Sequence, residues 1–170
     1  MIPPIRDFIV DYSDLKKFLT ENSQITLMTS VENHFRKVFL LSCASYYEND
    51  IQEIIKSFLA KHSYDEKVVC FATNKGISRQ YHTYFKWDDS NVNSFLGLFG
   101  SEFKTKISAE LKTNEEMNNC MKAFLTIGNE RNKMVHENFL LYQLEKTFEE
   151  IQKLNEDALK FVEYLRNVFK

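Results

Sequence analysis

Apolar residues recur every three or four positions over most of the chain, which is the spacing of an amphipathic helix. The longest such stretch covers residues 24–62, where Met28, Val31 and Phe35 begin a series of apolar positions. Within it, the sequence VFLLSCASYYEN is apolar on almost every side, so we expect it to be buried. This pattern predicts one long helix or two collinear helices.

Polar residues that favour helix starts divide the rest of the chain. Ser13, in DYSDLKKFL, predicts the start of a short helix near the amino terminus. The cluster at residues 88–90 predicts another start, with Gly97 or Gly100 at the end of that helix. A further short helix is expected over SEFKTKISAEL.

The two most regular helices are predicted near the carboxyl end. Asn114 is expected to cap a helix that continues to about residue 139. Thr147 and Glu150 match a capping box, in which each side chain bonds to the backbone of the other residue. A final amphipathic helix is therefore expected to begin at Thr147.

Residues 64–76 form the ambiguous part of the pattern. The run Val68–Ala72, within the stretch 66–73, fits a strand or a helix, and no second run is present to pair with a strand. Asn74-Lys75-Gly76 predicts a turn. Only 4 Gly and 2 Pro occur in 170 residues, which favours long helices over a sandwich or barrel. We therefore predict an all-α, single-domain helical bundle over residues 1–170, with long antiparallel helices and short helices in an irregular middle segment.

Composition narrows the class of protein further. Hydrophobic residues make up 44% of the chain, so it is expected to bury a core. The net charge of −2 argues against sequence-independent coating of nucleic acid, but a local basic cleft is compatible with it. The sequence contains neither a signal peptide pattern nor a run that could span a bilayer, so no membrane contact and a cytoplasmic location are expected. The three cysteines lack disulfide or zinc spacing, and neither a metal nor a cofactor is predicted.

Arg131, Asn132 and His136 form the candidate site, within NERNKMVHENF. Asn132 and His136 are four residues apart and share a helix face, and the long Arg131 side chain can curl toward the same side. An imidazole can move protons, a guanidinium can neutralise phosphate charge, and an amide can orient a hydroxyl. These groups fit metal-free cleavage of RNA, in which the ribose 2′-OH attacks the neighbouring phosphate. The same spacing also arises by chance, and a single helical His is most often a surface residue.

The sequence RNKMVH, residues 131–136, resembles the motif of the HEPN superfamily, in which Arg, followed by a polar residue that is often Asn, precedes His by several residues. The stretches LLSCASYYENDIQEII and GISRQYHTYFKWDD are similar to the RiboL-PSP-type and restriction-associated HEPN families. This resemblance implies a homodimer with facing motifs and metal-independent endoribonuclease activity, as a toxin or antiviral defence effector. It also implies that His136 is the general acid/base or its helper, that Arg131 holds the scissile phosphate, and that Asn132 orients this phosphate or the imidazole.

Two further residues are candidates for substrate binding. Glu48 could face the cleft, as acidic residues of this helix do in related families, or be a solvated helix charge. Arg79 could bind phosphate or be a surface residue. HEPN toxins controlled by a nucleotidyltransferase antitoxin often carry Tyr two residues after the His, whereas Asn138 stands there in this chain. An antitoxin or defence-system protein is a possible partner besides RNA. The alternative function is a non-catalytic dimerisation module that binds RNA, a nucleotide or a protein.

Overall fold

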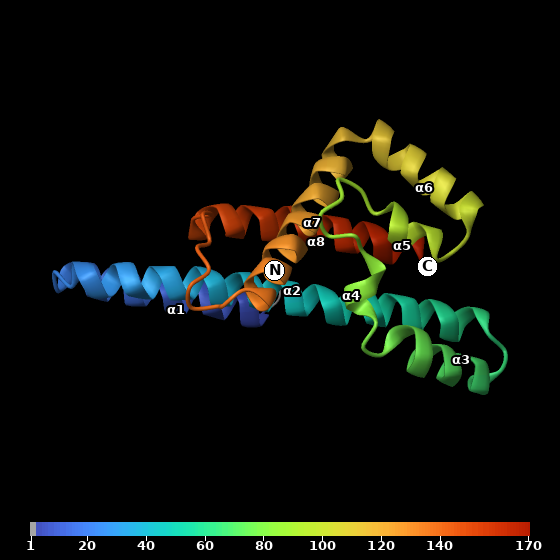
Figure 1. Cartoon of the computed structure of the whole chain (residues 1–170), viewed down its shortest axis with the longest axis horizontal. Coiled ribbons are helices and arrows are strands. Elements are labelled where there is room, and N and C mark those ends of the chain that lie inside the picture. Colours follow the sequence, from blue (N-terminus) through green and yellow to red (C-terminus); the bar gives the residue numbers. More distant parts are fainter. Residues whose placement is uncertain (1–2) are drawn as a thin grey trace.

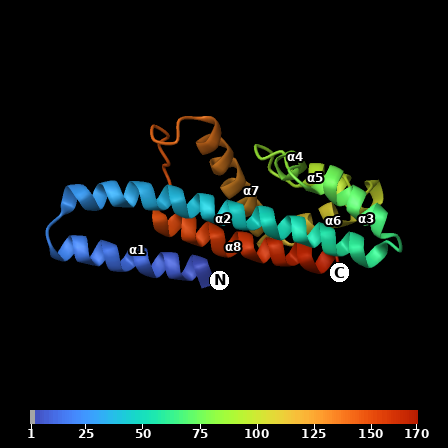
Figure 2. The same ribbon diagram turned by 90° about the horizontal axis from the view of Figure 1, so that it is seen from below.

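Three long helices organise the molecule: α2 (Ile25–His62), α7 (Glu115–His136) and α8 (Phe148–Val168). The computed structural model describes residues 3–170, which form a single all-helical domain with no strand in that range (Figure 1). Helix α1 (Pro3–Glu21) forms an antiparallel hairpin with the first half of α2, and α8 runs beside α2 in the same direction (Figure 2). Helix α7 crosses this layer obliquely (Figure 2). The predicted all-α fold is confirmed.

The middle of the chain contains short helical elements, as predicted. They lie together toward one end of the long helices, on the right in Figures 1 and 2. In chain order they are α3 (Glu66–Ala72), the π-helical turn η1 (Thr73–Ile77), α4 (Tyr81–Tyr84), α5 (Asn93–Gly97) and α6 (Ser101–Thr113).

Helix α2 is a single helix, so the long pattern over residues 24–62 is confirmed in its continuous form. The expectation that VFLLSCASYYEN is buried on all sides is wrong. Its inward residues are buried, but Val38 is 43% exposed and Ser42 and Ser45 are exposed. These three residues are spaced four and three positions apart, so they share one face of α2, and this face remains exposed.

The predicted helix start at Ser13 is also wrong, because α1 begins ten residues earlier, at Pro3. Proline fits the first turn of a helix, where its missing N–H has no partner to lose. Ile5, Tyr12 and Leu19 are spaced seven residues apart, two helical turns, and all three are buried. Burial of this stripe outweighs the local capping preference of Ser13, which lies exposed in mid-helix.

The ambiguous run at residues 68–72 is helical. Asp65 caps α3, since its side chain accepts a hydrogen bond from the backbone N–H of Lys67 at 2.9 Å. The expected turn at Asn74-Lys75-Gly76 is instead part of the π-helical turn, and the chain reverses at residues 78–80. Tyr84 holds this arrangement by donating a hydrogen bond to the Gly76 carbonyl at 2.7 Å.

The polar cluster at residues 88–90 lies in a turn, and α5 starts three residues later than expected. The buried Val92 occupies the cap position, while the Asn91 side chain accepts a hydrogen bond from the Asn93 backbone N–H. Gly97 ends α5 as predicted.

The caps predicted for the last two helices are confirmed. The Asn114 side chain accepts a hydrogen bond from the backbone of Met117, and Thr147 and Glu150 form the complete capping box. Both caps fix the ends of helices that pack tightly on each other and on α2. Within residues 3–170, no helix has the length and apolar character needed to cross a membrane.

Candidate functional site

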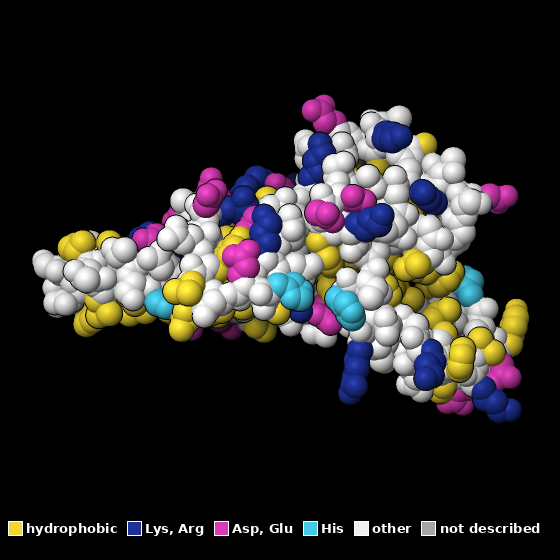
Figure 3. Space-filling model, in the orientation of Figure 1, with side chains coloured by type: hydrophobic (Ala, Val, Ile, Leu, Met, Phe, Trp, Pro, Cys, Tyr) yellow, Lys and Arg dark blue, Asp and Glu magenta, His cyan; other side chains and the backbone are white. Residues whose placement is uncertain are grey.

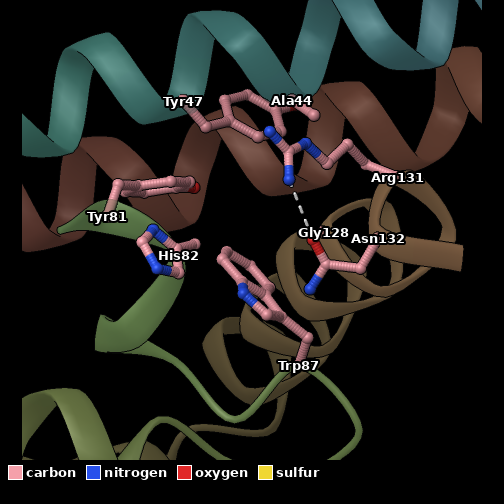
Figure 4. Close-up of a pocket in the computed structure, with 8 residues that line it drawn as sticks. All are labelled: Ala44, Tyr47, Tyr81, His82, Trp87, Gly128, Arg131 and Asn132. Atoms are coloured by element: carbon pink, nitrogen blue, oxygen red, sulfur yellow. Dashed lines mark hydrogen bonds between the residues drawn. The ribbon is translucent and has the colours of Figure 1, made fainter. Parts of the chain in front are cut away.

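Helix α7 brings Arg131 and Asn132 to a small pocket at its junction with α2 and α4 (Figure 4). Both side chains are half-buried. Arg131 Nη1 donates a hydrogen bond to Asn132 Oδ1 at 3.1 Å, so the amide fixes one side of the guanidinium. The free space is about 10 Å³, which is room for one water-sized group. The pocket is therefore the size of a single oxygen atom of a ligand rather than of a nucleobase.

Aromatic rings form most of the pocket wall. Helix α2 supplies Ala44 and Tyr47, α4 supplies Tyr81 and His82, and Trp87 follows α4 (Figure 4). The aromatic residues Tyr81, Tyr84, Phe85 and Trp87 are all buried and belong to the core.

Gly128 allows Trp87 to reach this position. A Cβ atom at Gly128 would lie 2.0 Å from two ring carbons of Trp87. The indole therefore lies directly against the backbone of α7, one turn before Arg131. Trp87 Nε1 has no hydrogen-bond partner within residues 3–170.

The Tyr81 hydroxyl lies within electrostatic range of both Glu48 and Arg131. Burial raises the pKa of Tyr81 well above its usual value, the Glu48 charge adds to this effect, and the Arg131 charge opposes it. Glu48 itself is half-buried and accepts a hydrogen bond from Gln52 at 3.4 Å. It lies near the edge of the pocket without lining it.

His136 lies outside this pocket. It is the last residue of α7, it is exposed, and its imidazole makes no hydrogen bond to another residue in the range 3–170. Within one chain the fold thus joins Arg131 to Asn132 but leaves His136 on the surface. Three exposed apolar residues flank this histidine along the chain: Val135, Leu140 and Leu141.

The segment after His136 is fastened to the rest of the protein. Lys37 is buried, and its Nζ donates a hydrogen bond to the Phe139 carbonyl at 2.9 Å while lying 5.3 Å from the centre of that ring. The Tyr142 hydroxyl donates to Glu130 Oε2 at 2.6 Å, which ties the segment back to α7. These contacts fix the path of the chain as it leaves His136.

Arg79 is exposed and does not line the pocket. It occupies the left-handed backbone region at φ 64°, at the reversal that precedes α4. Side chains of residues 3–170 include no group of three or more His, Cys, Asp or Glu placed to hold a metal ion.

Sequence reasoning missed Tyr81, His82 and Trp87 as pocket residues. Each comes from the middle segment. The packing of α4 on α2 and of Trp87 on Gly128 of α7 brings them beside Arg131. The dense aromatic run YHTYFKW, with one polar histidine inside it, was the available signal.

Acidic and basic side chains are interspersed over the face of the molecule that Figure 3 shows, and two histidine side chains lie near each other at the middle of this face.

The fold and the site define an all-helical domain with an Arg-Asn pair and a His five residues after the Arg on its penultimate helix. The family model RiboL-PSP-HEPN matches residues 6–170, and the chain belongs to this family. Comparison with curated proteins and with solved structures found no match. The resemblance identified from the sequence is thereby confirmed.

Proposed function

We propose that this protein is a metal-independent endoribonuclease that cleaves RNA at a composite site formed by two copies of the chain. The observation that carries the proposal is the pocket of Arg131 and Asn132. Among the described residues that line it there is no carboxylate, whereas Arg131, Asn132 and Trp87 all offer N–H donors. Such a pocket suits a phosphate oxygen. The family model covers the helix that carries Arg131 and Asn132.

The proposed reaction needs no metal or cofactor. The ribose 2′-oxygen bonds to the adjacent phosphorus and the bond from phosphorus to the 5′-oxygen breaks, leaving a 2′,3′-cyclic phosphate. One group accepts the 2′-OH proton, and another donates a proton to the departing 5′-oxygen. His136 acts in one of these transfers, Arg131 neutralises the phosphate charge, and Asn132 holds the guanidinium.

A second copy completes this site. His136 does not line the pocket of its own chain, and exposed apolar residues flank it. Such residues favour burial against a partner. A homodimer that buries them would place His136 of each chain opposite the motif of the other, so that each of its two sites pairs Arg131 of one chain with His136 of the other.

The biological role that we propose is that of a toxin or antiviral effector acting on RNA in the cytoplasm. Its control would come from an antitoxin or another protein of the same defence system. Glu48, near the pocket edge, and Arg79, exposed at the turn before α4, would contact RNA outside the reacting phosphate.

The test is cleavage of a labelled RNA in EDTA by the wild type and by His136→Ala, with the product ends mapped. General acid–base groups contribute about 10²–10⁴-fold, so the variant should lose activity by that factor. His34→Ala serves as the control, because His34 is an exposed residue of α2 that bonds only to its own helix backbone, at Ser30. Products with 2′,3′-cyclic phosphate ends in EDTA would establish the reaction.

Absence of cleavage by the wild type across several RNAs would instead favour a non-catalytic module that binds RNA, a nucleotide or a protein. Light scattering tests the dimer separately, and a monomer at micromolar concentration would contradict the composite site.

A further inference from the structure

Tyr81 lines the pocket and directs its hydroxyl into it (Figure 4). Its side chain is 8% exposed, and its hydroxyl points toward the Arg131 guanidinium across the pocket (Figure 4). No hydrogen bond joins this hydroxyl to another residue in the range 3–170. By contrast, the Tyr47 hydroxyl donates to Asn155 Oδ1 at 2.7 Å, and the Tyr84 hydroxyl donates to the Gly76 carbonyl at 2.7 Å.

Although the Tyr81 ring is buried, its hydroxyl is not one of the fully enclosed polar atoms that lack a partner, so the hydroxyl reaches the free space of the pocket. The pocket has space for one more atom of the size of an oxygen. The raised pKa of Tyr81 keeps its hydroxyl protonated near neutral pH, so it remains a donor. An acceptor that sits between Tyr81 and Arg131 would satisfy both groups.

We propose that Tyr81 is a further catalytic residue, which donates a hydrogen bond to a non-bridging oxygen of the phosphate held by Arg131. This inference rests on the proposed ribonuclease function and assigns to its pocket one particular ligand atom. Negative charge on that oxygen increases as the 2′-oxygen attacks, so the hydrogen bond strengthens in the transition state. The Tyr81 hydroxyl therefore contributes more to the cleavage rate than to RNA binding.

The test compares Tyr81→Phe with Tyr84→Phe, two variants that each remove one hydroxyl from the same short helix. Loss of a preorganised donor to a developing charge should lower the single-turnover cleavage rate of Tyr81→Phe by roughly 10- to 100-fold. Its unfolding midpoint should stay at the wild-type value, because the hydroxyl bonds to no described residue. Tyr84→Phe should behave in the opposite way, with a lower midpoint and normal cleavage, because it loses the bond to Gly76.

A phosphorothioate substrate separates contact with the phosphate from a change in structure. Sulfur is a weaker hydrogen-bond acceptor than oxygen, so wild-type protein should cleave one of the two diastereomers more slowly. In Tyr81→Phe this difference between the diastereomers should become smaller, because only Arg131 still donates to that oxygen. A difference that persists unchanged in Tyr81→Phe would overturn the proposed contact.

RNA that carries 2′-O-methyl groups lacks the nucleophile and tests binding alone. Tyr81→Phe should bind it about 2- to 10-fold more weakly than wild type, the range for one neutral hydrogen bond. If wild type cleaves no RNA but this loss of affinity is measured, the ribonuclease proposal fails while the phosphate contact stands. If Tyr81→Phe matches wild type in both cleavage and binding, the role of Tyr81 is overturned and the ribonuclease is unaffected.

Discussion

The two ends of the motif lie on one helix but in different surroundings. Arg131 is half-buried, bonded to Asn132, and enclosed by side chains from α2 and α4. His136, at the end of α7, is exposed, and its imidazole has no hydrogen-bond partner in residues 3–170. The fold therefore preorganises the half of the motif that would bind phosphate, Arg131 and Asn132, because fixed hydrogen-bond donors are most effective there. It leaves the half that would move protons, His136, at the surface, where a second copy of the chain can complete the site.

Mixing two inactive variants tests this division most directly, and we expect the largest effect here. Arg131→Ala and His136→Ala homodimers should each lose cleavage by about 10²-fold or more. If each site combines Arg131 of one chain with His136 of its partner, mixed dimers contain one intact site. Cleavage after mixing and subunit exchange should return to roughly a quarter of wild type for random pairing. An unchanged, inactive mixture would place both residues in the same chain.

Gly128→Ala should damage the phosphate-binding half by pushing Trp87 out of the wall. The added Cβ would approach the indole to 2.0 Å, and overpacking of this kind costs about 1–3 kcal/mol of folding stability. We expect a lower unfolding free energy in urea, together with slower cleavage. Gly97→Ala is the matched control, since its Cβ would meet only Lys104 Cδ at an ordinary 3.8 Å. Equal stability of the two alanine variants would contradict the close packing of Trp87 on α7.

Lys37→Met should affect the other half, through the segment that follows His136. The substitution leaves the Phe139 carbonyl without its donor, which costs about 1–3 kcal/mol when the acceptor stays buried. We expect faster amide hydrogen exchange over residues 137–146 and a several-fold loss of cleavage. Phosphate-backbone binding, measured with 2′-O-methyl RNA, should hold. Lys17→Met, at an exposed lysine of α1, is the control and should change neither the hydrogen exchange of residues 137–146 nor the cleavage rate.

Thr147→Ala should have the smallest effect on cleavage. It removes the capping box at the start of α8, which typically stabilises a protein by about 1 kcal/mol. The residue does not line the pocket, so cleavage well below the melting temperature should equal that of wild type. A large loss of cleavage would show that stability alone, and not the surroundings of Arg131 and His136, sets the activity of these variants.

Local patterns in the sequence predicted the long helices well. The continuous α2, the Asn114 cap and the capping box at Thr147 each depend on residues within a few positions of one another. The start of α1 was missed because burial of Ile5, Tyr12 and Leu19 against the rest of the protein outweighs the preference of Ser13. Burial in the tertiary structure outweighs the local capping preference of a residue where the two conflict.

The candidate site was predictable only in part for the same reason. The motif residues could be read from RNKMVH, because their spacing is a property of one helix. The contact of Trp87 with Gly128, 41 positions apart in the sequence, cannot be read from either neighbourhood. Tyr81 likewise joins the site only through the packing of a one-turn helix against α7.

The buried hydrogen bond between Tyr47 and Asn155 determines when the pocket wall can form during translation. Tyr47 forms a wall of the pocket, yet its hydroxyl is anchored to α8, 108 residues later in the chain. A nascent chain that has already exposed α2 and α7 outside the ribosome still lacks that anchor. The pocket wall beside Arg131 is therefore complete only after α8 has left the ribosome and docked against α2.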